Sequence, residues 1–400
     1  MVFTAASQTI IVTPILPLIA AELDVPVGQL GWLVSVYSVV LAAAALVMGP
    51  ISDRIGRKRV MVVGAGVLTV VLALHAFADT FALLLGARVL AGAGGGMLSG
   101  AAVSYVGDAF PYARRGWATG WVMSGVPFGL VLGIPAGRVL AAGLGFQAPF
   151  VSFAVVMAAA FVLLIAVVPQ PDVQRTARPT VAGALRLYGD FLRRPGPAMA
   201  SLLYFVMYGG LGLLIVYMPA WLSGRFPLDV SVGGHPLTAG GLPIDFIAVL
   251  FFVGGVASVL VGPRAGALSD RVGRRPLVLA SSVGLAVLAA AIPFAVTTRP
   301  FAVVLYVVLM SLFAMRMAPF QALLTALVPA NERGAFLSLT IAIGQIGTAA
   351  GAVAGGVLYG RYGFTANALA SAATMALMAG LVWARFPEPV EAGAAAAVPE

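Results

Sequence analysis

Few side chains in this sequence could do covalent chemistry. The 400 residues include no cysteine and two histidines, His75 and His235. Without cysteine there is no disulfide, thiolate metal site or cysteine nucleophile, and two histidines leave almost nothing for a metal centre. No arrangement of residues typical of catalysis is apparent. We therefore expect no enzyme, no cofactor and no metal site.

Two arginines are the charged residues with the most unusual surroundings. Arg88 follows Gly86 in one long apolar run, and Arg316 precedes Pro319 in another. An arginine at the centre of a membrane-spanning helix costs about 2.5–3.5 kcal/mol on insertion scales, so both should point away from lipid. Two roles stay open for Arg316. It could act in a central substrate cavity, or it could have a structural role, paired with another side chain or bonded to a backbone carbonyl.

Neutral polar and aromatic side chains in the apolar runs could line the same cavity. Because an amide facing lipid would be left without partners, Gln8, Gln321 and Gln345 should face the protein interior. Most aromatic residues in such runs serve packing. We predict a substrate cavity that includes Gln8, Arg88, Trp121, Tyr208, Arg316, Gln321 and Gln345.

The elements that position these residues are predicted to be membrane-spanning helices. Hydrophobic residues make up 61% of the chain and charged residues 9%, whereas a soluble chain carries about 25% charged residues. Continuous apolar runs exclude a β-barrel, whose strands are shorter and alternate in polarity. Twelve runs are long enough for helical spans, at 2–23, 30–49, 60–78, 82–107, 117–143, 148–168, 198–222, 244–264, 277–296, 301–328, 336–359 and 364–384.

The basic residues predict the orientation in the membrane. With both termini on one side, 17 of the 23 basic residues fall on that side, whereas Arg138, Arg225, Arg299 and Arg361 fall on the other. The richer side is cytoplasmic by the positive-inside rule. The net charge of +9 therefore reflects topology and not nucleic-acid binding. Heavy use of Ala, Gly and Arg beside a single lysine suggests a bacterial source, and hence the inner membrane.

No acidic residue lies in the middle of a predicted span, where a proton carrier would be expected. All 14 lie at or beyond the ends of the predicted spans, and none lies at mid-membrane. A proton-coupled transporter needs a group that titrates within the membrane or at its edge. The candidate proton carriers are therefore Glu22, Asp108 and Asp245.

The chain contains an internal repeat. Gly49-Pro-Ile-Ser-Asp53-Arg54-Ile-Gly56-Arg57-Lys58 returns 217 residues later as Gly266-Ala-Leu-Ser-Asp270-Arg271-Val-Gly273-Arg274-Arg275. At an offset of 218, Pro111 and Arg115 match Pro329 and Arg333, and Gly129, Gly133 and Gly137 match Gly347, Gly351 and Gly355. Because an even number of spans separates the copies, the two six-helix halves have parallel topology.

The repeated loop motif resembles the signature of the major facilitator superfamily. The resemblance covers nearly the whole chain, and it implies an all-α membrane protein with twelve transmembrane helices in two pseudo-symmetric six-helix bundles. It also implies a cytoplasmic gate built from Gly49, Asp53, Arg54, Gly56, Arg57 and Asp108, with Gly266, Asp270, Arg271, Gly273 and Arg274 as the second copy. Gly49 should let two helices approach closely. Ala326 stands where a second Asp108 would map, so we expect an asymmetric latch.

Span five is predicted to pack closely against another helix. Gly129, Gly133 and Gly137 recur at every fourth position, and Pro135 permits bending. This pattern is similar to the span-five motif of exporters and antiporters in the same family. Arg88 matches the family's span-four arginine, which the resemblance implicates in proton coupling.

Four regions and a transport function follow from these patterns. The regions are an N-terminal bundle at 1–168, a cytoplasmic linker with an amphipathic helix at 169–197, a C-terminal bundle at 198–384 and a tail at 385–400. The stretch 223–243, rich in Gly and Pro, should be a loop. The leading hypothesis is a monomeric, alternating-access transporter that exports small lipophilic or drug-like molecules in exchange for protons. The alternatives are an organic-anion or sugar-acid carrier and a non-transporting membrane sensor.

Overall fold

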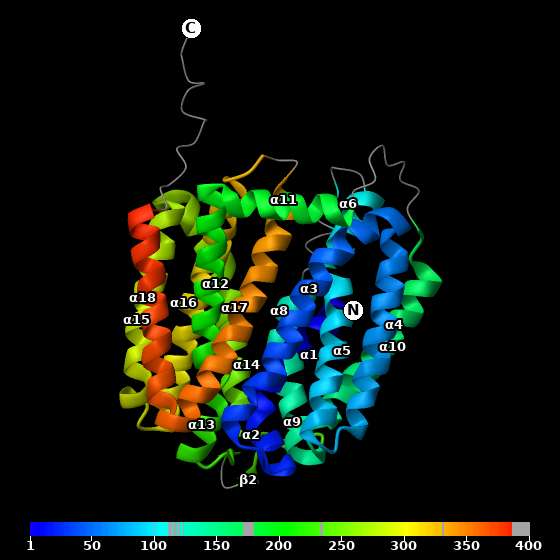
Figure 1. Cartoon of the computed structure of the whole chain (residues 1–400). Helices are drawn as coiled ribbons and strands as arrows, with labels where there is room; N and C mark the ends of the chain where they lie inside the picture. The colour runs from blue at the N-terminus through cyan, green and yellow to red at the C-terminus, as the bar shows by residue number, and fades with distance from the viewer. Residues whose placement is uncertain are drawn as a thin grey trace.

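The computed structural model describes residues 1–99, 101–110, 114, 118, 121–122, 124–170, 180–232, 235–329 and 332–385. This part of the chain is almost entirely helical (Figure 1). The first helices are α1 (Val2–Ile10), α2 (Val12–Leu23), α3 (Gly31–Ile55), α4 (Arg57–Leu74), α5 (Phe81–Ser99), α6 (Ala101–Ala109), α8 (Gly125–Phe128), α9 (Ile134–Leu144) and α10 (Ala148–Val167). They are followed by α11 (Val181–Arg193), α12 (Pro195–Ile215), α13 (Met218–Arg225), α14 (Phe246–Val272), α15 (Arg274–Ala295), α16 (Arg299–Thr325), α17 (Arg333–Tyr362) and α18 (Phe364–Arg385).

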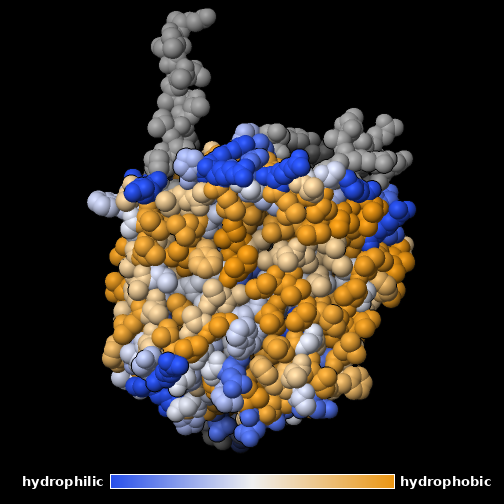
Figure 2. All heavy atoms as spheres, viewed as in Figure 1, coloured by the Kyte–Doolittle hydropathy of each residue, from blue (hydrophilic) through white to orange (hydrophobic). Residues whose placement is uncertain are grey.

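These helices can cross a membrane. Within the described residues, eleven spans are long and apolar enough, and the bent pair α1 and α2 makes up to twelve. The prediction of an all-α, multi-pass membrane protein is therefore confirmed. The outer surface agrees with it, because Figure 2 shows an apolar belt with hydrophilic residues gathered toward the two ends.

The chain forms two groups of helices side by side. In Figure 1 the helices up to α10 lie on one side, α12 to α18 lie on the other, and α11 lies across one end. We call these groups the N-half and the C-half. The end of the molecule at α11 is called the linker end, and the opposite end, where the β-strands lie, is called the hairpin end.

The stretch 223–243 is more ordered than the loop we expected. It forms two short antiparallel hairpins, in which β1 (Ser231–Val232) pairs with β2 (His235–Pro236) and β3 (Thr238–Ala239) pairs with β4 (Leu242–Pro243). Gly240 and Gly241 have φ values of 58° and 82°. Side chains rarely tolerate this conformation, so the two glycines provide the tight turn between β3 and β4.

The first span is bent between α1 and α2, which meet at 48°. Pro14 has no backbone N–H and cannot donate to the carbonyl of Ile10, so one bond of the helical ladder is missing at the break. Gln8 and Thr9 therefore occupy the last turn of α1, beside the bend.

The glycines of span five lie against the first span. Gly129 and Gly133 face Ser7 of α1, and a β-carbon at Gly137 would lie 2.6 Å from Cδ1 of Ile11. The stretch Gly129–Gly133 is a π-helical turn, and Pro135 follows it in the first turn of α9. Residues 125–144 form one continuous helix, so Pro135 lies inside it and cannot donate to a preceding carbonyl, beside a π-turn where the regular hydrogen-bond ladder already changes. The small residues therefore let the two spans come close.

The same contact recurs in the C-half. Gly347 and Gly351 face the backbone of α12, and a β-carbon at Gly355 would lie 2.8 Å from the ring of Tyr217. Tyr217 is fully buried, and its hydroxyl donates to the carbonyl of Ala352 at 2.6 Å. The sequence repeat is therefore also a repeat of helix packing.

The N-half and C-half meet closely near the hairpin end. A β-carbon at Gly28 would lie 2.7 Å from the carbonyl oxygen of Gly356. Ser35 of α3 donates to the carbonyl of Ala349 in α17 at 2.6 Å. Contacts this close leave no passage between α3 and α17 at this level.

The linker helix α11 packs on the C-half. The Thr180 side chain accepts a hydrogen bond from the Gly183 N–H at 2.9 Å and caps the helix N-terminus. Tyr188 and Phe191 are buried, and the Phe191 ring lies 5.3 Å from Phe336 of α17. The amphipathic helix is therefore attached to protein through these aromatic residues.

Candidate transport site

Arg88 lies at the centre of a buried polar network in the N-half. Its guanidinium donates from Nη1 to both the backbone and the side-chain oxygen of Gln8, each at 3.2 Å. The Gln8 amide donates to the Tyr37 hydroxyl at 2.8 Å, and that hydroxyl lies 2.6 Å from Thr9 Oγ1. The guanidinium also lies over the Tyr37 ring at 4.2 Å, a cation–π contact. The first, second and fourth spans are thus joined by one cation.

Glycines determine where Tyr37 can lie. A β-carbon at Gly92 would meet the Tyr37 backbone oxygen at 2.6 Å, and one at Gly95 would meet the Tyr37 hydroxyl at 2.7 Å. The absence of side chains at these positions on α5 lets α3 approach and brings the phenol under Arg88. Arg88 is fully buried, and its Nε and Nη2 have no hydrogen-bond partner among the described residues. The network therefore holds the cation and leaves two donors unused.

Arg316 in the C-half has much weaker partners. It is fully buried, and its Nη1 lies 3.1 Å from the sulfur of Met375 and 3.7 Å from that of Met378. The guanidinium lies 5.2 Å from the centre of the Phe313 ring. Thioethers are weak acceptors, so the charge has little compensation. Its Nε has no partner in the described part of the chain.

The predicted cavity residues do not form one cluster. The structure brings Gln8 to Arg88, whereas the Tyr208 ring stacks on Tyr204 at 5.5 Å. Gln321 is exposed, and its side chain is in hydrogen-bond contact with the buried Tyr204 of α12. Gln345 is half-buried on α17, and Trp121 is 67% exposed.

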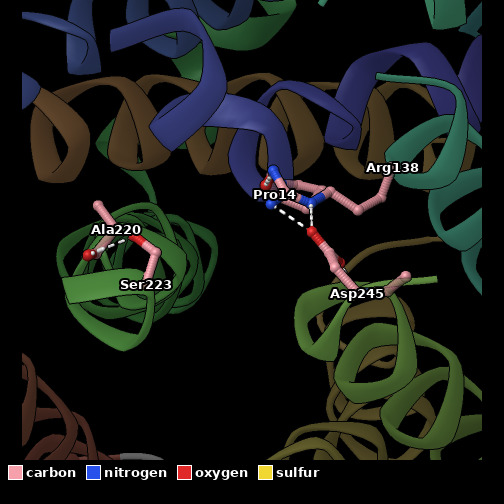
Figure 3. Close-up of polar contacts among 6 residues, drawn as sticks. Pro14, Arg138, Ala220, Ser223 and Asp245 are labelled. Atoms are coloured by element: carbon pink, nitrogen blue, oxygen red, sulfur yellow. Dashed lines mark hydrogen bonds and ion pairs between the residues drawn. The ribbon is translucent and has the colours of Figure 1, made fainter. Parts of the chain in front are cut away.

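A third buried arginine is Arg138, which was expected on the external side and not among the arginines within the spans. The residue is fully buried in α9 and donates from Nε to Asp245 Oδ2 at 2.7 Å, with Nη2 2.5 Å from the same oxygen (Figure 3). Its Nη1 donates to the carbonyl of Pro14 in α2 at 2.8 Å. A signal was available, because Arg138 lies inside the predicted run 117–143 and directly follows Gly137 of the packing face.

The three candidate proton carriers lie at the two ends of the molecule. Asp245 caps α14 at the hairpin end, where its Oδ1 accepts from the Ala248 N–H at 2.9 Å. Glu22 is exposed at the end of α2 and accepts from the Phe146 N–H at 3.2 Å. Asp108 lies in α6 and forms an ion pair with Arg57. None of the three contacts Arg88.

The repeated motif places two glycines where only glycine fits well. Gly56, between α3 and α4, has φ of 103°, and Gly273, between α14 and α15, has φ of 99°. Both values lie in the region that side chains avoid. The preceding serines also match, since Ser52 Oγ donates to the Gly49 carbonyl at 2.9 Å and Ser269 Oγ donates to the Gly266 carbonyl at 2.6 Å. The motif therefore encodes a fixed turn at the linker end of each half.

The charged members of the motif differ between the halves. Arg57 donates from Nε to Asp108 at 3.2 Å and from Nη1 to Ser52 at 2.8 Å. In the second copy, Arg274 Nη2 lies 3.9 Å from Asp270 Oδ1. Asp270 is near the end of α14 and Arg274 begins α15, so this pair is local in the sequence. Arg54 and Arg271 are exposed, and the side chain of Asp53 lies outside the described residues.

The expected close helix approach at Gly49 is wrong for this structure. A β-carbon there would meet nothing within 4 Å. Gly266, its counterpart, would make only an ordinary contact of 3.6 Å with Ala318. The repeat-related Pro111 and Arg115 lie outside the described residues.

Two bundles of membrane-spanning helices, related by a repeat and each containing a deep arginine, define a class of membrane transporter. The family model of the Major Facilitator Superfamily matches residues 1–244 and 237–400. The chain therefore belongs to this superfamily and is a transporter, not an enzyme.

Relatives and one solved structure extend this comparison. The chain is 25% identical over 386 residues to the multidrug resistance protein MdtG of Proteus mirabilis, covering 95% of this chain and 92% of that protein. It is 27% identical over 358 residues to the 3-(3-hydroxy-phenyl)propionate transporter of Escherichia coli, covering 88% and 83%. A crystal structure of a D-xylose-proton symporter shares the fold, with a TM-score of 0.78 and 16% identity over 97% of this chain and 96% of that one.

Proposed function

We propose that this transporter exports small, moderately lipophilic organic molecules in exchange for protons by alternating access. The observation that carries alternating access is the repeated pair of halves, which are closed against each other at the hairpin end by Ser35, Ala349 and the Arg138–Asp245 pair. The likeness to a protein named for multidrug resistance supports export. The bundles 1–168 and 198–384 are the moving units, and one monomer is sufficient.

The test of export is flux in proteoliposomes. Purified protein should move fluorescent lipophilic compounds when a proton gradient is imposed, and the flux should stop when the gradient is collapsed. Arg88→Gln should abolish gradient-driven flux because the polar network loses its cation. Arg361→Gln, a change of an exposed arginine at the end of α17, is the matched control and should retain it. If no tested compound moves under either polarity of the gradient, the export proposal is wrong.

The proton carrier is proposed to be one of Glu22, Asp108 and Asp245. Each is changed in turn to its amide, and gradient-driven flux is compared with counterflow exchange, which needs no net proton movement. The carrier is the residue whose amide variant loses driven flux and retains exchange. Three variants that all keep driven flux would show that none of these acids carries the proton.

We propose that the linker end is cytoplasmic, with both termini on that side of a bacterial inner membrane. The support is the distribution of basic residues, which gather in the loops at this end. Since the chain has no cysteine, single thiols report sidedness directly. Ala182→Cys in α11 and Thr238→Cys in β3 are both exposed positions. In intact cells, an impermeant maleimide should label only Thr238→Cys, and the reverse result would invert the topology.

The second candidate function is the carriage of organic anions. Arg316 favours it, because a buried guanidinium with thioether partners is poorly compensated and a substrate carboxylate would supply a bidentate acceptor. The likeness to a transporter named for a hydroxyphenylpropionate points the same way. Arg316→Gln should then remove the thermal stabilisation that aromatic carboxylates give and leave that of neutral compounds unchanged. Equal losses for both classes would reject the anion site.

A further inference from the structure

We propose that Arg138 and Asp245 form a lock that holds the hairpin end closed and must break once in each transport cycle. This proposal rests on the alternating-access part of the proposed function. Arg138 belongs to α9 in the N-half, and Asp245 precedes α14 in the C-half (Figure 3). Among the ion pairs between described residues, it is the one that joins the two halves.

Asp245 is fixed firmly to the C-half. Its Oδ1 caps α14 through the Ala248 N–H at 2.9 Å. Its backbone pairs with Asp229 in an antiparallel bridge, and the next residue, Phe246, donates its N–H to the Leu228 carbonyl at 2.8 Å. The carboxylate therefore moves with the C-half and cannot follow a departing partner.

Arg138 is fixed equally firmly to the N-half. It is fully buried, and its Nη1 donates to the Pro14 carbonyl in α2 at 2.8 Å. Both residues of that contact belong to the N-half, so it survives when the halves separate. The contacts that must break are those from Arg138 Nε and Nη2 to Asp245 Oδ2, at 2.7 and 2.5 Å.

The surroundings make this pair strong. The side chains are 0% and 9% exposed, so water competes little for either charge. The two halves also meet closely elsewhere on α9, because a β-carbon added at Gly143 would lie 2.7 Å from a methyl carbon of Leu242 in β4. Removing one charge leaves the other buried without compensation, whereas removing both does not. A double variant therefore avoids the penalty of an unpaired buried charge while still lacking the contact between the two halves.

The test uses a single thiol at the buried Ala349 of α17, whose backbone carbonyl accepts the hydrogen bond from Ser35 near the hairpin end and is kept when the side chain is changed. In the Ala349→Cys background, an impermeant maleimide is applied from the hairpin side to protein in lipid vesicles. Asp245→Asn and Arg138→Gln should each speed labelling by about tenfold or more, since truncating one partner of a buried charge pair has large effects. Asn retains a side-chain oxygen for the helix cap. Asp229→Asn, an exposed acid beside the pair, is the matched control and should label at the original rate.

The double variant decides whether the pair acts as a lock or only stabilises the fold. Asp245→Asn with Arg138→Gln leaves no uncompensated charge, so the protein should melt closer to the wild type than either single variant. Labelling should nevertheless stay fast, because the halves are no longer held together. Slow labelling in the double variant would overturn the lock. The readout needs no substrate, so fast labelling without any drug flux would reject the export proposal and leave the lock standing.

Discussion

A methyl group added at Gly95 should damage the Arg88 network through Tyr37, and the damage should disappear when the Tyr37 hydroxyl is removed. A β-carbon at Gly95 would lie 2.7 Å from that hydroxyl, and the next atoms are Leu41 Cδ1 at 3.4 Å and Tyr37 Cζ at 3.6 Å. Of these three atoms, only the hydroxyl oxygen would lie closer to the new β-carbon than an ordinary van der Waals contact. Gly95→Ala must therefore push the phenol away from Gln8 and Thr9, to which it is bonded at 2.8 and 2.6 Å.

The magnitudes follow from these contacts. Overpacking of this kind costs about 1–3 kcal/mol of folding free energy. Tyr37→Phe alone removes two hydrogen bonds, each contributing about 0.5–1.5 kcal/mol, and keeps the ring under Arg88. In the Tyr37→Phe background, the methyl group at position 95 meets no atom closer than 3.4 Å. Its cost there should fall to about zero, so the two changes should couple by about 1–3 kcal/mol.

The assay is a double-mutant cycle on purified protein in detergent, with unfolding free energies from denaturant titration. Gly86→Ala is the control on the same helix, because it is exposed and a β-carbon there meets nothing within 4 Å. It should be neutral or slightly stabilising, since alanine is the better helix former. Equal costs of Gly95→Ala in both backgrounds would refute the proposed contact between this glycine and the Tyr37 hydroxyl.

Three further predictions address the repeated motif, the packing in the C-half and the linker helix. Gly56→Ala and Gly273→Ala should each lower stability by about 1–3 kcal/mol because of their positive φ, whereas Gly49→Ala should not, and thermal melting of the three variants checks this. Asn367→Leu should cost about 2 kcal/mol, because its amide bonds the Leu213 and Gly355 carbonyls, each at 3.0 Å, and a melting point like wild type would contradict it. Phe191→Ala should release α11 from α17 and speed proteolysis within 180–194, whereas the exposed Leu192→Ala should not.

Much of the fold could be predicted because lipid restricts the choices. Backbone groups in a bilayer must bond internally, so long apolar runs become helices and their ends follow the runs closely. The repeat added the arrangement of the halves, since Gly129 and Gly347 have equivalent packing roles. The stretch 223–243 was less predictable. Its hairpins depend on glycines such as Gly240, which in the sequence look the same as those of an irregular loop.

The candidate site was only partly predictable, since partners of a polar residue come from other helices. Gln8 was expected to face inward, and it does, but its bonds to Arg88 depend on the bend at Pro14 and on the glycines of α5. Gln321 carries the same amide, but its partner is Tyr204 of α12 and not a cation. Hydropathy does not reveal which face of a helix meets protein. The sequence can therefore identify the polar residues in a span without assigning their neighbours.

The three buried arginines differ in how their charge is compensated, and this difference separates their proposed roles. Arg138 has a carboxylate from the opposite half, so its pairing is tied to the relative position of the halves. Arg88 has neutral oxygens and an aromatic ring from its own half, which keep the cation in place whatever the halves do. Arg316 has thioethers, which leave it the most to gain from an added anion. The proposed role of each buried arginine therefore follows from its hydrogen-bond acceptors. A carboxylate across the interface between the halves indicates a gate, and neutral oxygens from the same half indicate a fixed charge. Weak acceptors indicate a site for an anionic ligand.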